Sequence, residues 1–347
     1  MEEVITIGLD VAKGVFHAVG RDACGKKLFS RQLRRGQVLG FFARQAPCVV
    51  AMEACGSAHD WARRLEAVGC RVKLIAPIYV KPFVVRNKND ERDADGLSQA
   101  AQRPDMRTVG IKSAEQQARA SLHRVRDLMI RQRTQVMNQI RGVAAEFGLT
   151  TRVGRPGLKD LIAQAKAADL PAPARQAIAV QARHLDQLDE AIADLTAQVV
   201  RQAKASADAR RLMTIPSVGD VVADAFLARL PDLSTFKTGR DLAAWLGLTR
   251  LDRSTGGKPR TSGPISKKGD KALRRLLVLG ATAVIARQQR SGRLDPWIAG
   301  VIRRRCFRVA AVALAAKTAR IIWALLVRGG TYQSGHQPIP GPIPAAA

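Results

Sequence analysis

Aromatic side chains are scarce in this chain, at 4% of its 347 residues. Proteins that bind single-stranded nucleic acid by base stacking need aromatic platforms, so we exclude a protein built mainly on such stacking. Cysteines are also few. The five are odd in number and show neither CxxC spacing nor neighbouring histidines, which disfavours a zinc site or a disulfide framework.

Long uncharged apolar runs are missing too. The start, Met1-Glu2-Glu3-Val4, is acidic and precedes a strand-like segment, so no signal peptide is visible. The apolar stretch from Val309 to Val327 is interrupted by Lys317 and Arg320, which is unfavourable for a membrane span. We therefore expect a cytoplasmic protein with no membrane partner.

Acidic residues are far outnumbered by basic ones. The chain has 57 Lys and Arg against 29 Asp and Glu, and its net charge of +28 calls for a polyanionic partner such as nucleic acid. Residues 1–106 hold 17 basic and 12 acidic side chains, whereas the other 241 residues hold 40 and 17. Most of the nucleic-acid binding is therefore expected after residue 106.

The first 110 residues alternate between strand-like and helix-like segments. Three early strands with short connections predict an antiparallel meander, and the later alternation predicts parallel crossovers on the same sheet. The expected fold class here is α/β, a mixed sheet with flanking helices. Strands are expected at Val4–Leu9, Val15–Val19, Lys27–Leu33, Val49–Glu53 and Arg71–Ile75, and helices at Val38–Arg44 and Asp60–Val68.

Two long helical segments follow. Ser113-Ala114-Glu115-Gln116 offers an N-cap, and apolar residues at helical spacing predict a helix that ends before Gly148. A second helix is expected from Ala172 to Ala205, after a joining segment with Gly and Pro. We interpret the pair as an antiparallel arm that dimerises or spans nucleic acid, with a bundle that simply packs as the open alternative.

The last third of the chain has a different texture. The segment Ile215–Gly219 predicts a tight turn before a helix, and such a turn either binds phosphate through free N–H groups or forms an ordinary helix-turn-helix corner. A loop or hairpin is expected at 248–264, and helices at about Lys271–Arg287 and Arg308–Arg328. The tail contains four prolines and is expected to be disordered.

Four carboxylates give the strongest indication of chemistry. Asp10 and Glu53 each end an apolar strand-like run, while Asp90 and Asp93 are three apart, on one face of an expected helix. Carboxylates this close repel one another unless cations lie between them, so the four predict a divalent metal site. Oxygen ligands alone favour Mg²⁺ or Mn²⁺, and two such ions can clamp the attacking and leaving oxygens of a phosphodiester.

These acids also have structural explanations. Asp90 and Asp93 are favoured at a helix start by the helix dipole, and Glu53 could be a loop acid. The neighbouring Glu91 and Asp95 are interpreted as solvated charges at the helix start, with Asp95 as a remote alternative ligand.

The second candidate, Ser266, lies in the stretch from Arg250 to Arg275. This stretch holds nine basic and two acidic residues and is expected to be a concentrated phosphate-binding surface. Cations flank its hydroxyl, which makes it a candidate nucleophile, although no activating base is identifiable. A serine before a helix is more often an N-cap, and capping stays the alternative. The residues expected to bind nucleic acid are Arg250, Arg253, Lys258, Arg260, Lys267, Lys268, Lys271, Arg274 and Arg275.

Together these motifs resemble the DEDD transposases of bacterial insertion-sequence family one-hundred-ten, and especially its eleven-eleven subgroup. The resemblance spans nearly the whole chain. It rests on the segments Ile7–Lys13, Met52–His59, Arg86–Ala94, Lys112–Gln117, Ile215–Gly219, Leu246–Leu248 and Ile265–Asp270.

The resemblance implies an RNase-H-like (RuvC-like) domain in which Asp10, Glu53, Asp90 and Asp93 match the metal-binding tetrad. It implies that Ser266 is the nucleophile, which attacks a DNA phosphodiester and holds the broken strand as a phosphoserine during strand exchange. No high-energy cofactor is then needed. One residue departs from the family's pattern: in the turn expected at Ile215–Gly219, Ser217 stands where many relatives have glycine.

The resemblance also implies the partners of the protein. A noncoding guide RNA pairs with target and donor DNA, and the protein acts as a homodimer or homotetramer whose tetrad and serine come from different protomers. The activity is expected at the bacterial nucleoid. The domains expected are a catalytic domain at 1–110, a coiled-coil-like arm at 111–208, a basic transposase domain with a helix-hairpin-helix-like motif and the serine loop at 209–330, and the tail at 331–347.

Two other functions remain open from the sequence. A hydrolytic RNase-H-like nuclease or Holliday-junction resolvase would use the same ions to activate water, without a covalent intermediate. A catalytically silent organiser of RNA or DNA would not depend on the acids at all.

Overall fold

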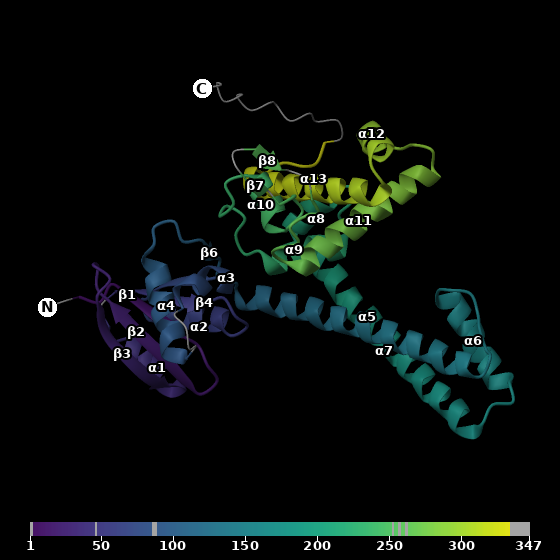
Figure 1. The fold of residues 1–347 in the computed structure, drawn as a ribbon, viewed down its shortest axis with the longest axis horizontal. Helices are drawn as coiled ribbons and strands as arrows, with labels where there is room; N and C mark the ends of the chain where they lie inside the picture. The colour runs from purple at the N-terminus through teal and green to yellow at the C-terminus, as the bar shows by residue number, and fades with distance from the viewer. Residues whose placement is uncertain are drawn as a thin grey trace. The chain divides into compact units, whose positions relative to one another are not determined.

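A computed structural model describes residues 3–45, 47–84, 89–251, 253–255, 258–260 and 263–333, with backbone alone for 253–255 and 258–260. Its contacts divide the chain into two compact units (Figure 1). The first comprises Met1–Gln117 with Leu230–Asp232, and the second comprises Ala118–Arg229 with Leu233–Ala347.

A six-stranded sheet in the order β3-β2-β1-β4-β5-β6 forms the centre of the first unit. The first three strands pair antiparallel, β1, β4 and β5 pair parallel, and β6 is antiparallel to β5. The predicted meander and the predicted parallel crossovers are both confirmed. The strands are β1 (Thr6–Asp10), β2 (Val15–Arg21), β3 (Lys27–Arg34), β4 (Val49–Glu53), β5 (Arg71–Ile75) and β6 (Thr108–Val109).

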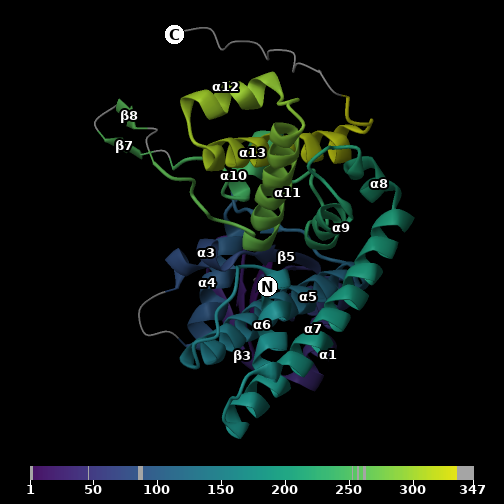
Figure 2. The same cartoon turned by 90° about the vertical axis from the view of Figure 1, so that its right-hand side faces the viewer.

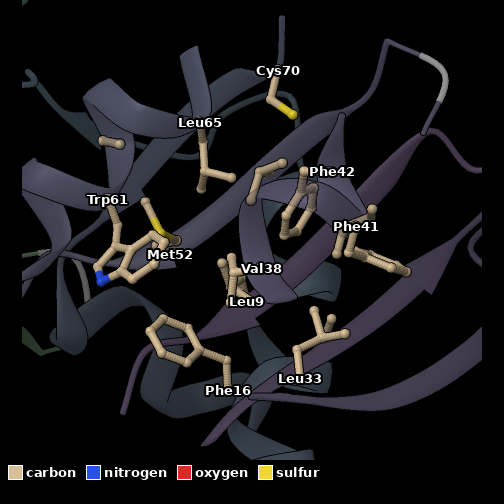
Figure 3. Packing of buried hydrophobic residues seen from close by; sticks show 14 of the residues in the cluster. Leu9, Phe16, Leu33, Val38, Phe41, Phe42, Met52, Trp61, Leu65 and Cys70 are labelled. Carbon is tan, nitrogen blue, oxygen red and sulfur yellow. The ribbon is translucent and has the colours of Figure 1, made fainter. Parts of the chain in front are cut away.

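Helices cover both faces of this sheet. On one face, Leu9, Phe16 and Met52 pack with side chains from two helices in the main core (Figure 3). Phe16 and Trp61 meet edge to face with ring centroids 4.8 Å apart. The helices of this unit are η1 (Arg35–Gln37), α1 (Val38–Phe42), α2 (Ala58–Glu66), α3 (Pro77–Val80), η2 (Lys81–Phe83) and α4 (Asp90–Gln102).

The opposite face of the sheet carries α4. Because side chains alternate along a strand, Gly8 and Ala51 lie on this face while their neighbours Leu9 and Met52 enter the main core. A Cβ at Gly8 would collide with the carbonyl oxygen of Ala94. The glycine therefore allows α4 to lie directly on β1.

Two long helices, α5 (Ala114–Glu146) and α7 (Ala172–Ala205), form the predicted antiparallel pair. Arg126 Nε on α5 donates to Thr196 Oγ1 on α7 at 2.7 Å. The segment between them is not a simple turn, because it contains the helix α6 (Arg155–Ala167), whose Leu158 and Leu161 pack against the end of the pair.

The rest of the second unit is mainly helical, and the predicted hairpin is present (Figure 2). Between α8 and α9, the Ser217 hydroxyl hydrogen-bonds the buried Thr318 hydroxyl at 2.7 Å, so serine at this position is packed within the turn. The elements are α8 (Ala207–Met213), α9 (Asp220–Arg229), α10 (Gly239–Trp245), β7 (Arg253–Thr255), β8 (Lys258–Arg260), α11 (Lys271–Arg290), α12 (Pro296–Arg304) and α13 (Phe307–Arg328).

Among the described helices, α13 has the length and composition that could cross a membrane. It packs against α10, α11 and α12, and buries Ala315, Ile322 and Trp323. This packing assigns it to the core of the second unit. The expectation of a disordered tail concerns residues that lie outside the described part of the chain after 333.

The expected fold class is confirmed: a mixed sheet with flanking helices is followed by a long helical pair and a mainly helical C-terminal part. The boundaries expected for the domains stay a prediction.

Candidate active site

Two parallel strands deliver acids to the same edge of the sheet. Asp10 is the last residue of β1 and Glu53 is the last residue of β4. The two strands pair in register from Thr6 and Val49, so they end side by side. The alternation that places Gly8 and Ala51 on the α4 face places Asp10 and Glu53 there as well.

The first turn of α4 adds two more carboxylates. Asn89 caps the helix, because its side chain accepts from the Arg92 amide at 2.8 Å. Asp90 and Asp93 follow in the first turn, where the helix dipole favours negative charge. One carboxylate oxygen from each of Asp10, Asp90 and Asp93 lies within 4.8 Å of the others.

The electrostatics of Asp10 reflect this crowding. Its pKa is raised above the ordinary value, first by burial and then by the charges of Asp93, Asp90 and Glu53. Glu53 is not one of the three residues that share the 4.8 Å spacing, yet its charge acts on Asp10. The structure thus brings three of the four predicted ligands together and places the fourth within electrostatic range.

This donor set suits a divalent cation. Carboxylate oxygens are the ligands of hard ions, and a bound cation would relieve the mutual repulsion that, after burial, raises the pKa of Asp10. Asp10 and Asp93 are half-buried and Asp90 is exposed, so the site is open on one side for a substrate.

The neighbouring acids have other partners. Asp95 Oδ1 accepts from Arg21 Nη2 at 2.6 Å, and its Oδ2 accepts from Gln99 Nε2 at 2.8 Å. Glu91 pairs with Lys27 at 2.7 Å. Both oxygens of Asp95 are occupied, so it ties α4 to β2 instead of joining the acidic group.

Two residues of the site were missed from the sequence. Gly8 sets the distance between β1 and α4, and a glycine inside a strand pattern was a signal of such close approach. His17 lies opposite Asp10 in the sheet register, and its Nδ1 is 4.0 Å from Asp90 Oδ2. This nitrogen is buried and has no hydrogen-bond partner among the described residues.

Ser266 lies in a turn before α11 and is half-exposed. Its amide donates to the Thr249 carbonyl at 2.8 Å, and the Lys267 amide donates to the Gly247 carbonyl at 3.2 Å. Asp270 caps α11 by accepting from the Ala272 and Leu273 amides at 2.8 and 2.9 Å. The alternative that Ser266 is the cap of this helix is therefore wrong.

The nine predicted basic residues differ in their surroundings. Arg250, Lys267, Lys268 and Lys271 are exposed, and those of the hairpin, Arg253, Lys258 and Arg260, have side chains outside the described part. Arg275 pairs with Asp127 on α5 at 2.6 Å, and Arg274 donates to two backbone carbonyls. Position in the sequence did not distinguish the arginines that form ion pairs or hydrogen bonds within the protein from the exposed lysines.

Comparison with known proteins identifies the class. A family model described as "Transposase" matches residues 7–147, which include the sheet and the acidic group, and another, described as "Transposase IS116/IS110/IS902 family", matches residues 209–294, which include Ser266. The sheet, the acidic group and both matches define a DEDD transposase.

Relatives place it more narrowly. A "Probable family 20 transposase" of Pseudomonas aeruginosa is 45% identical over 95% of this chain and 98% of its own. A "Transposase for insertion sequence element IS1328" of Yersinia enterocolitica is 37% identical over 96% and 99%, and one for IS1111A of Coxiella burnetii is 37% identical over 96% and 93%. The chain belongs to the IS110/IS1111 family of DEDD transposases.

Proposed function

We propose that this transposase is a metal-dependent site-specific recombinase that cleaves and exchanges DNA strands through a phosphoserine at Ser266. One observation carries the proposal: Asp10, Asp90 and Asp93 converge within 4.8 Å at the end of β1. Carboxylates held this close repel one another, and a bound divalent cation relieves that repulsion.

Asp10, Glu53, Asp90 and Asp93 would hold one or two Mg²⁺ or Mn²⁺ ions. When bound, such ions stabilise the negative charge that develops on a reacting phosphodiester. The chain's own part is to fix the carboxylates on two strand ends and one helix start, so that little reorganisation is needed when DNA arrives.

Ser266 supplies the covalent step. Its Oγ loses a proton and forms a bond to phosphorus, while the deoxyribose oxygen leaves and takes up a proton. One phosphodiester is exchanged for another, so the reaction needs no external energy source and reverses when a new DNA hydroxyl attacks. The exposed Lys267 and Lys268 supply positive charge beside the reacting phosphate.

Nucleic-acid partners follow from the distribution of charge. Residues beyond 106 hold 40 basic against 17 acidic side chains, enough to hold a noncoding guide RNA together with target and donor DNA. Base pairing by the RNA would then supply the specificity, and protein contacts would be mostly to backbone. We propose a homodimer or homotetramer, a composite site of tetrad and serine from different protomers, and action at the cytoplasmic nucleoid.

The decisive test is covalent trapping. The protein, the element's own flanking RNA and labelled DNA are incubated with Mg²⁺, denatured and separated by electrophoresis. We expect a protein–DNA adduct that Ser266→Ala abolishes. The matched control is Ser291→Ala, since Ser291 lies beyond the other end of α11 and its hydroxyl donates to the Gln288 carbonyl at 3.1 Å.

The alternatives give different products. Free DNA ends without an adduct would favour the hydrolytic nuclease or resolvase, and unchanged activity in Asp10→Ala and Glu53→Ala would favour a silent organiser. The role of the RNA is tested by comparing recombination products with the RNA supplied and withheld. Equal products in both reactions would remove the guide from the proposal.

A further inference from the structure

We propose that Arg274 is a positioning residue that holds the turn carrying Ser266, and that it does not act mainly as a phosphate contact. The proposal deepens the proposed function and rests on Ser266 being the nucleophile. The sequence alone predicts a phosphate contact, because Arg274 lies in the most basic stretch of the chain.

The guanidinium joins two backbone segments. Arg274 Nη1 donates to the Leu246 carbonyl at 2.9 Å and to the Lys268 carbonyl at 2.7 Å. Leu246 is the C-cap of α10, where carbonyls lack helical partners, and Lys268 comes two residues after the serine. One charged donor thus satisfies the end of α10 and fixes the turn against it.

The same two segments are in direct contact along their length. A Cβ at Gly269 would collide with the Trp245 carbonyl, and one at Gly247 would collide with the Lys268 backbone. Both glycines have positive φ, 73° and 71°. Only glycine gives this backbone path without strain or collision, so a side chain at either position would displace the turn from the end of α10.

The start of α11, which carries Arg274, is itself held in place by hydrogen bonds. Asp270 caps α11 through two amides and accepts from Arg229 Nη1 on α9 at 3.1 Å. Arg274 lies one turn further along α11, and its amide donates to the Asp270 carbonyl at 3.1 Å. The guanidinium therefore connects the serine turn to a helix start that is held from two directions.

Misplacement of the serine and loss of a phosphate contact have different measurable consequences. An attacking oxygen must be aligned with the phosphorus, and a displacement of about 1 Å can cost on the order of 10²-fold in rate without weakening binding. A phosphate contact instead changes affinity, and its loss reduces the slope of log K against log salt by about one.

The test uses two substitutions in the full chain with its RNA and DNA. Arg274→Lys keeps the charge but replaces the planar guanidinium with a shorter, strongly hydrated ammonium, and Arg274→Gln removes the charge. We expect both to lower the rate of adduct formation at saturating DNA by on the order of 10²-fold. The DNA dissociation constant and its salt slope should stay within twofold of wild type.

The matched control is Arg290→Lys. Arg290 lies at the end of the same helix, is exposed, and donates through Nε to the Ala286 carbonyl of its own helix at 3.3 Å. It should leave both the rate and the affinity unchanged. Hydrogen exchange adds a direct readout: in Arg274→Lys the amides of Ser266 and Lys267 should exchange faster, while those in the middle of α11 should not.

Each other outcome overturns a stated part. A wild-type rate in Arg274→Lys with weakened binding in Arg274→Gln would make Arg274 a phosphate contact. Global loss of protection in either variant would assign it to overall stability and refute a local positioning role. Full adduct formation in Ser266→Ala would instead refute the proposed nucleophile, whatever the Arg274 variants do.

Discussion

Gly8 on β1 and Ala94 on α4 are in such close contact that a single methyl group at position 8 would overlap the Ala94 carbonyl oxygen. This contact determines how near the first turn of α4 comes to the end of β1. The convergence of the acidic group therefore depends on the residue at position 8 having no Cβ atom.

We expect Gly8→Ala to push α4 away from β1, and overpacking of this kind costs about 1–3 kcal/mol. Strand cleavage should be lost along with the response of thermal stability to added Mg²⁺ or Mn²⁺, because the carboxylates no longer share a cation. Calorimetry with and without the ion measures the stability and its response to the ion, and a cleavage assay on labelled DNA measures the activity. The control is Gly14→Ala, since a Cβ at Gly14 meets no atom within 4 Å; wild-type metal response in Gly8→Ala would contradict the prediction.

Asp10→Asn should separate stability from activity. In the absence of a divalent ion it removes one charge from a repelling group, so the melting temperature should rise. With the ion present, wild type should gain stability and the variant should not, because a ligand is missing. Cleavage should fall by at least about 10²-fold in Asp10→Asn and in Asp93→Asn.

Binding of DNA and RNA should survive both substitutions, because the basic surface is unchanged. Gel-shift titration measures this, with the exposed Asp105→Asn as the control; Asp105 pairs with Arg103 at 3.4 Å. An equal loss of binding and cleavage would refute the separation.

Asp224 should be critical for the second unit. Its fully buried carboxylate accepts from Arg119 Nε at 3.1 Å and contacts His123 Nε2 at 2.7 Å. Burial raises the pKa of Asp224, but the hydrogen bonds and charges of His123 and Arg119 outweigh it and leave the pKa below its usual value. The stabilisation is therefore present above about pH 4 and is lost as the pH falls through the folded pKa.

Asp224→Asn breaks this buried network and should lower the free energy of unfolding by about 3–5 kcal/mol at pH 7. The control is Asp208→Asn, whose carboxylate is half-exposed and lies 3.5 Å from Arg211, and it should cost less than about 1 kcal/mol. Urea unfolding measures both. Similar values for the two variants would show that the network contributes no more than a surface pair.

His59 should make the first unit sensitive to acid. It is buried, its Nδ1 accepts from the Lys112 amide at 3.2 Å, and burial together with the charges of Lys112 and Arg63 lowers its pKa to about 4. The unfolded chain takes up a proton near pH 6.5, so stability falls as the pH drops from about 6.5 to about 4. The loss is on the order of 3 kcal/mol at the lower limit.

His59→Asn keeps an acceptor near the position of Nδ1 and should remove this part of the pH dependence. Unfolding midpoints at pH 7.5 and 4.5 measure it, with the exposed His184→Asn as the control. A pH dependence as steep in His59→Asn as in wild type would show that other groups are responsible.

Elements with clear local signals were predictable from the sequence. β4, β5 and α7 have the bounds expected, because each is an apolar-patterned run with definite limits. α6 was missed because the segment with Gly and Pro, which includes Pro156 and Gly157, was interpreted only as a connection between the two long helices. A proline in the first turn starts a helix well, and Gly157 allows that turn to pack against the Arg152 carbonyl.

The candidate site was predictable as far as strands and helix starts deliver its acids. Asp10 and Glu53 could be placed at one edge because parallel neighbours end together. The hydrogen bond of Arg274 could not be predicted, because its acceptor is the carbonyl of Leu246, 28 residues away, and no local sequence pattern indicates that contact. Charge composition locates the basic stretch, whose role in nucleic-acid binding stays a prediction, and it gives no information on which of its cations form internal hydrogen bonds or ion pairs.

Lys267 has a φ of +55°, and it is the one non-glycine residue with positive φ in the part of the chain that the structure describes. This backbone conformation costs a residue with a side chain about 1–2 kcal/mol, and glycine adopts it without that cost. Thermostability engineering would select glycine here and, with it, remove the cation next to Ser266. On the proposed role of Ser266, a variant stabilised in that way should form the protein–DNA adduct more slowly, so optimisation of this turn for heat resistance and optimisation for turnover lead in opposite directions.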